Sequence, residues 1–137
     1  MNLMAYRFVE HTSDIIIEAT GKTFSEAFEW LAKGMFTQMG EAKTEKATEK
    51  FGIEADAGAM DILVVKALSE LLAELEIREI TPFKVAVEKF DKAKITLSFS
   101  VYGEKKAPKN IIKAVTFHEL IVKEEKGKWT IRVLFDI

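Results

Sequence analysis

Apolar and polar residues alternate at both ends of the chain, which is the pattern of β-strands with one buried face. Near the start, "MAYRFVEH" and "DIIIEAT" flank the turn "HTS". The chain finishes on "WTIRVLFDI", in which every second residue is large and apolar: Trp129, Ile131, Val133, Phe135 and Ile137. This alternation predicts a last strand that packs one face on the core and ends at two adjacent carboxylates, those of Asp136 and of the chain end.

Two stretches between these strands have helical spacing. "GKTFSEAFEWLAKGMFTQMG" repeats apolar residues every three or four positions, and Thr23 with Glu26 forms a capping box at its start. Gly40 is a natural helix end, whereas Gly34 inside the helix should cost about 1 kcal/mol relative to alanine. The second stretch, "MDILVVKALSELLAELEI", predicts a mostly buried helix with a stripe of five apolar residues at its centre: Ile62, Val65, Leu68, Leu72 and Leu75.

The remaining stretches again alternate with a period of two. "EKATEKFGIEA" contains one predicted strand, two more follow Pro82 and are joined through "KFDKAK", and "IIKAVTFHELIVK" pairs with the last strand through "EEKGK". The order strands–helix–strand–helix–strands favours an α+β fold of about seven mainly antiparallel strands and two amphipathic helices. At 137 residues, we expect a single compact domain over residues 1–137.

The composition narrows the functional classes. The chain has no cysteine, which excludes a disulfide framework, a thiolate nucleophile and a cysteine-ligated metal. The net charge is −2 and the only basic cluster, "GEKKAPKN", is short, so we expect no strong direct binding of nucleic acid. The apolar runs are too short for a signal peptide or a membrane span, so we expect a cytoplasmic protein that does not bind membranes. The sequence has no conventional hydrolase or phosphate-loop motif.

Carboxylates are the main candidates for chemistry. Asp14 opens a predicted strand after the turn "HTS", and Asp136 stands beside the α-carboxylate of Ile137. If these three ionised groups are gathered, they repel one another unless a cation lies among them. Oxygen ligands select hard ions such as Ca²⁺ and Mg²⁺. The alternative, which the pattern alone favours, is that Asp14 caps a turn and Asp136 is a solvated edge residue.

Four more residues are candidates, each with a structural alternative. His11 is either a ligand or acid–base group, or a turn residue bonded to the backbone. His118 lies among apolar residues of a predicted strand, where a half-buried, hydrogen-bonded histidine is more common than a functional one. Asp61 is a functional acid or a cap at the start of the second helix. Lys113 by default extends over the edge of the sheet.

Three blocks of the sequence resemble the archease family. "YRFVEHTSDIIIEATGKTFSEAFEWLAKGMF" is similar to its N-terminal signature, a His-Thr-small-Asp turn followed by a glycine and an aromatic-rich helix. "MDILVVKALSELL" looks like its second helix, which begins at an acid. "IIKAVTFHELIVK" followed by "WTIRVLFDI" is similar to its C-terminal hairpin, which ends on Asp plus one aliphatic residue. The resemblance spans essentially the whole chain, and it differs from the family pattern at Ser13 and in residues 66–68 and 103–110.

The resemblance implies a small α+β protein that is an accessory factor rather than an enzyme. Archeases assist the metal-dependent RNA ligase that joins tRNA halves after intron removal. They promote guanylylation of the active-site histidine of the ligase and so its repeated turnover. An RNA ligase protein is therefore the expected partner.

The resemblance also implies a metal site, usually described as calcium, with magnesium as the alternative ion. By motif, its ligands fall on Asp14, Asp136 and the terminal carboxylate of Ile137. Two other functions remain open. One is a chaperone-like modulator of nucleic-acid-processing proteins. The other, a metal-assisted hydrolase that uses Asp14, Asp136 and His11, is disfavoured because no general base is evident beyond the ligands.

Overall fold

The computed structural model describes residues 5–10, 14–40 and 47–137. Within these ranges the chain forms seven strands and two helices, which confirms the predicted α+β class. In chain order the elements are β1 (Ala5–Glu10), β2 (Asp14–Gly21), α1 (Phe24–Met39), β3 (Glu49–Asp56), α2 (Met60–Arg78), β4 (Ile80–Asp91), β5 (Thr96–Lys105), β6 (Ala114–Glu125) and β7 (Lys128–Asp136).

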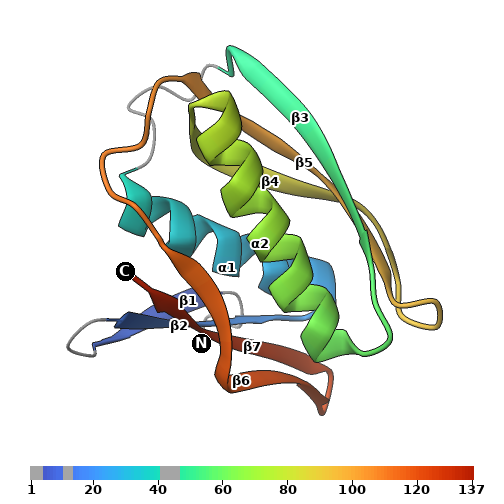
Figure 1. Cartoon of the computed structure of the whole chain (residues 1–137). Helices are drawn as coiled ribbons and strands as arrows, with labels where there is room; N and C mark the ends of the chain where they lie inside the picture. Colours follow the sequence, from blue (N-terminus) through green and yellow to red (C-terminus); the bar gives the residue numbers. More distant parts are fainter. Residues whose placement is uncertain (1–4, 11–13, 41–46) are drawn as a thin grey trace.

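The strands form two antiparallel sheets, and both helices lie between them (Figure 1). The first sheet has the order β1-β2-β7-β6, and the second has the order β3-β5-β4. Helix α1 packs against β2 of the first sheet and β4 of the second, while α2 packs mainly against β6 and β3. Each helix therefore contributes to the interface with both sheets, and one hydrophobic core fills the space between the layers.

Local signals in the sequence account for the bounds of α1. The hydroxyl of Thr23 accepts a hydrogen bond from the backbone N–H of Glu26 at 3.1 Å, and the Glu26 carboxylate accepts one from the N–H of Lys22 at 3.0 Å. The helix ends at Gly40, which has the left-handed φ of 83° that favours glycine. The helix continues through Gly34. The absence of a side chain at this position lets Ile17 and Tyr6 pack closely against the helix. A Cβ there would lie 2.9 Å from both Ile17 and the ring of Tyr6.

The buried face of α2 differs from the predicted stripe. Ile62, which the stripe included, is 45% exposed, whereas Val64 and Leu71, which lie outside the stripe, are fully buried. The observed buried face is centred on Val64, Leu68, Leu71 and Leu75. It is rotated around the helix axis, by about the angle between successive residues, from the centre of the predicted stripe. The shift follows from the position of α2 between β6 and β3, which buries two sides of a helix that is apolar around much of its circumference.

Aromatic rings join α1 to both sheets. The ring of Phe24 stacks on Phe90 of β4, with 4.2 Å between centroids, and meets Trp129 of β7 edge-on at 5.5 Å. Phe28, one turn later, contacts Phe99 of β5 at 5.1 Å. Such pairs contribute about 0.5–1.5 kcal/mol each beyond the area that they bury. They fix the position of β7, and hence of its C-terminal end, relative to the second sheet.

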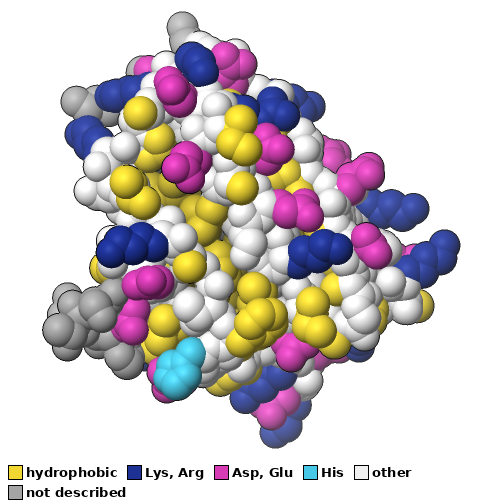
Figure 2. Space-filling model, viewed as in Figure 1, with side chains coloured by type: hydrophobic (Ala, Val, Ile, Leu, Met, Phe, Trp, Pro, Cys, Tyr) yellow, Lys and Arg dark blue, Asp and Glu magenta, His cyan; other side chains and the backbone are white. Residues whose placement is uncertain are grey.

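Charged residues of both signs are interspersed on the face of the molecule that carries α2 and β6, with apolar side chains between them (Figure 2). Large apolar side chains that are exposed in the described part of the chain include Ile62 and Ile77 of α2, Ile111, and Phe117 of β6. In the described ranges, no helix combines the length and apolar composition needed to cross a membrane.

Candidate metal centre

The register of the first sheet places Asp14 directly opposite Asp136. Asp14 is the first residue of β2 and Asp136 the last of β7, and these strands are antiparallel neighbours. On its other side β7 pairs with β6, and the carbonyl of Asp136 accepts a hydrogen bond of 2.7 Å from the N–H of Lys113. Because β7 is held from both sides, the backbone at Asp136 is firmly placed although it lies near the chain end.

The two carboxylates, called here the aspartate pair, lie on the outer face of this sheet. Side chains alternate along a strand, and the neighbours Ile15 and Phe135 both belong to the core. Residues directly opposite in an antiparallel pair have Cβ atoms about 4.5–5.5 Å apart. Both aspartates are half-buried, and Asp136 makes no side-chain hydrogen bond or ion pair with the described residues. The side chain of Ile137 packs against the core and so anchors the last residue.

Arg132, on the same face of the sheet, is engaged with other acids. Arg132 lies within 3.8 Å of the carboxylate of Glu18 and 4.0 Å of that of Glu119. Between this charged row and the aspartate pair lie Ile16 and Leu134, which are 0% and 6% exposed. The arginine therefore does not neutralise the aspartate pair. Like charges directly opposite one another destabilise a sheet, and a bound cation would remove that cost.

The donor set fits a hard divalent cation. Carboxylate oxygens are the ligands that Ca²⁺ and Mg²⁺ prefer, and Ca²⁺ takes six to eight oxygens. Among the described residues, no group of three His, Cys, Asp or Glu side chains comes together. The aspartate pair can therefore supply part of a coordination shell, and further oxygens have to come from main-chain carbonyls, a terminal carboxylate, water or a partner.

Of the other candidates, one is not described and one lies far from the aspartate pair. His11 lies outside the described residues. Asp61 is in the first turn of α2, where its carboxylate accepts a 2.8 Å hydrogen bond from the N–H of Ile62. The start of α2 and the C-terminus lie at opposite sides of the view in Figure 1, so the two places are well separated. Asp61 is not the N-cap, which is Ala59, but its charge complements the positive end of the helix.

Lys113 adjoins the aspartate pair through its backbone. Its N–H is the donor to Asp136, and its exposed side chain lines a hollow of about 270 Å³ together with Leu72 and Glu76 of α2. Lys113 directly precedes β6, which is an edge strand of the first sheet.

His118 is exposed, and the expectation of a half-buried histidine is wrong. Between Thr116, opposite Leu134, and Ile121, opposite Arg132, β6 advances five residues while β7 advances two. The extra residues of β6 are not paired with β7 and form a large bulge. The His118 side chain lies in this bulge and is 74% exposed. Its backbone N–H donates to the hydroxyl of Thr116 at 3.3 Å. Strict alternation cannot reveal such an insertion, although a positive φ of 54° at Glu119 marks it in the structure.

The model of the Archease protein family (MTH1598/TM1083) matches residues 6–137 of the chain. The chain belongs to the archease family. It is 33% identical over 135 residues to the protein archease of Thermococcus kodakarensis, covering 93% of this chain and 95% of the relative. It is 29% identical over 139 residues to the protein archease of Sulfolobus acidocaldarius, covering 96% and 98%.

Solved structures of archease-like proteins share the fold. The solution structure of Methanobacterium thermoautotrophicum protein 1598 superposes with a TM-score of 0.82 at 28% identity, covering 97% of this chain and 99% of that one. The crystal structure of a Thermotoga maritima protein, described as an archease and possible chaperone, superposes with a TM-score of 0.61 at 21% identity, covering 94% of each chain. The second likeness shows the fold of the archease family alone.

Proposed function

We propose that this protein is an accessory factor of the metal-dependent RNA ligase that joins tRNA halves. It promotes guanylylation of the ligase, and hence repeated turnover, through a divalent cation held at the aspartate pair. The observation that supports the proposal most is the direct cross-strand pairing of Asp14 with Asp136 in a member of the archease family. The structural alternative for these two residues, a turn cap and a solvated edge residue, does not require them to face each other.

In this proposal Asp14, Asp136 and the α-carboxylate of Ile137 hold the cation, with Ca²⁺ preferred and Mg²⁺ as the alternative. When bound, the cation supplies positive charge at the protein surface to which oxygen ligands of the partner are attracted. The chain itself supplies a rigid support. Pairing of β7 with both neighbours positions Asp136, and packing of the Ile137 side chain against the core positions the end of the main chain.

The proposal is tested by ligation of tRNA halves under single-turnover and multiple-turnover conditions, with and without this protein. We expect the protein to raise the number of joined products per ligase molecule, and Asp14→Ala and Asp136→Ala to abolish that stimulation. Glu104→Ala is a matched control, because Glu104 is also half-buried on a strand and makes no ion pair among the described residues. The assignment fails if both aspartate variants are folded, as judged by circular dichroism, and stimulate as well as the parent.

A chaperone-like role is the second candidate, because the Thermotoga maritima relative was described as a possible chaperone. This role predicts suppression of aggregation of several unrelated proteins that does not depend on the metal. Citrate synthase and malate dehydrogenase, heated with and without the protein in EDTA, provide the comparison. Protection of both clients that survives Asp136→Ala favours the chaperone role over the ligase role.

A further inference from the structure

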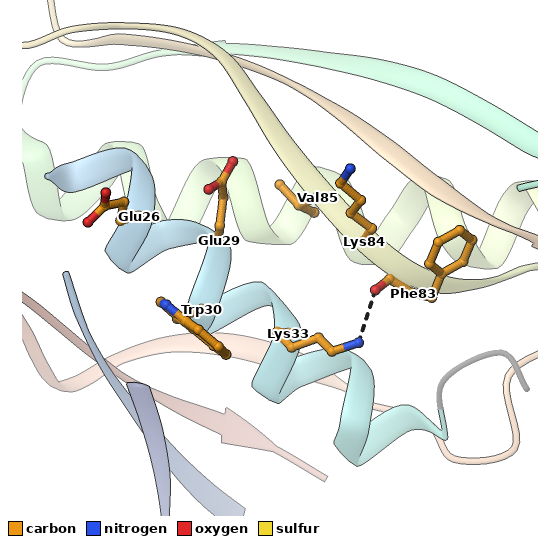
Figure 3. A pocket seen from close by; sticks show the side chains of 7 residues that line it. All are labelled: Glu26, Glu29, Trp30, Lys33, Phe83, Lys84 and Val85. Carbon is orange, nitrogen blue, oxygen red and sulfur yellow. Dashed lines mark hydrogen bonds between the residues drawn. The ribbon is translucent and has the colours of Figure 1, made fainter. Parts of the chain in front are cut away.

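A pocket of about 460 Å³ lies between α1 and β4, away from the aspartate pair. Its lining comes from one face of α1, including Glu29, Trp30 and Lys33, and from Phe83 to Val85 of β4 (Figure 3). This volume is within the range of about 300–1,000 Å³ found for small ligand sites. No lining residue belongs to β2 or β7, so the pocket is independent of the proposed metal site.

Strand β4 is an edge strand, and α1 covers part of its free edge with two side chains. The ammonium group of Lys33 donates to the carbonyl of Phe83 at 3.3 Å, and the carboxylate of Glu29 accepts from the N–H of Val87 at 2.8 Å (Figure 3 shows the first). A neighbouring strand would provide a donor to the same carbonyl and an acceptor for the same N–H. The two side chains thus replace the hydrogen-bonding groups of a missing strand at two points.

Val85 lies midway between these two points. The register with β5 is regular from Lys84 to Val87, so the backbone groups of Val85 point to the same side as the N–H of Val87, away from β5. No hydrogen bond to another described residue engages the N–H or the carbonyl of Val85, although its side chain is in the core. The edge is therefore open over one residue, between an acidic side chain at one end and a basic one at the other.

We propose that this pocket binds an extended peptide segment of a partner protein. One residue of the segment pairs through its N–H and C=O with Val85, and its side chain lies against the indole of Trp30. Unpaired edge-strand groups are a template for strand addition, and main-chain hydrogen bonds supply affinity in that mode. Charge complementarity indicates which charged residues the segment carries on each side of the paired residue. A segment antiparallel to β4 places its N-terminal side near Glu29 and its C-terminal side near Lys33, which suits a basic residue before the paired residue and an acidic one after it.

The test is a titration of the ¹⁵N-labelled full chain with the blocked tripeptide acetyl-Lys-Leu-Glu-amide, followed by ¹H–¹⁵N NMR. We expect saturable shifts of the Val85 amide and of the Trp30 indole N–H at peptide concentrations up to about 10 mM. The matched control peptide carries an N-methyl group on its leucine, which removes one donor and keeps every side chain. It should bind at least about tenfold more weakly.

A second variant tests the protein side. Val85→Pro removes the free N–H at an edge position where proline does not break the ladder, and it should abolish binding of the unmodified peptide. If that variant does not fold, the comparison of the unmodified and N-methylated peptides still tests the proposal. The proposal is overturned if the Val85 amide shows no saturable shift, or if the N-methylated peptide binds as tightly as its parent. In either case Glu29 and Lys33 serve only to protect the edge from pairing.

Discussion

Replacing Asp136 by asparagine should stabilise the metal-free protein. Asp14 and Asp136 are direct cross-strand neighbours, and the substitution removes one of two like charges while keeping the size of the side chain. At about 5 Å, two unit charges repel by about 0.8 kcal/mol in water and about 3 kcal/mol at an effective dielectric constant of about 20. Because both residues are half-buried and salt screens the pair, we expect a gain of about 1 kcal/mol in the free energy of unfolding.

The assay is urea and thermal unfolding in EDTA at low ionic strength. For a chain of this size, about 1 kcal/mol corresponds to a rise of about 3–5 °C in the melting temperature. The gain should shrink at 1 M salt, where the screening length falls to about 3 Å. Glu104→Gln serves as the control for removal of one negative charge and should change stability by less than about 0.5 kcal/mol.

Repulsion within the aspartate pair is excluded if Asp136→Asn lowers the stability of the metal-free protein, or if the gain does not depend on salt. The first result means that the Asp136 carboxylate is stabilised within the protein itself, and the second means that the gain does not come from repulsion between the two charges. A cation would then not be needed to offset the charge of the aspartate pair.

Two further predictions concern the core and the chain end. Gly34→Ala should lower the free energy of unfolding by about 1–2 kcal/mol in urea titrations, because crowding against Ile17 and Tyr6 outweighs a helix propensity that favours alanine by about 1 kcal/mol. Ala73→Gly, on an exposed position of α2, isolates the propensity effect, and a stabilising Gly34→Ala would contradict the packing. Adding one alanine after Ile137 moves the α-carboxylate and leaves both aspartates in place. It should remove most of the rise in melting temperature that Ca²⁺ produces, and an unchanged rise would exclude that carboxylate as a ligand.

Periodicity predicts those parts of the fold that depend on neighbours in sequence. The capping box at Thr23, the end of α1 at Gly40 and the buried face that every second residue of β7 forms are local features, and the structure confirms them. The exposure of Ile62 is not local. It depends on which two sides of α2 meet β6 and β3, and a helix that is apolar around much of its circumference does not specify this.

The candidate site also combines features that depend on neighbours in sequence with features that depend on long-range packing. Alternation places a carboxylate at each strand end, but strand order and register decide that Asp14 and Asp136 meet. The burial of Leu134 could not be predicted from alternation, which places this residue on the face of β7 that points away from the core. The bulge that exposes His118 inserts residues into one strand only, and the open edge at Val85 depends on where α1 packs. Each of these features is set by long-range packing.

Isothermal titration of the metal-free protein with Ca²⁺ examines the aspartate pair itself, because the proposed function requires this pair to hold the cation. We predict one binding site in the parent protein and in Glu104→Gln, and loss of measurable binding in both Asp14→Asn and Asp136→Asn. Binding of Ca²⁺ that is unchanged in both aspartate variants would exclude the aspartate pair as the cation site.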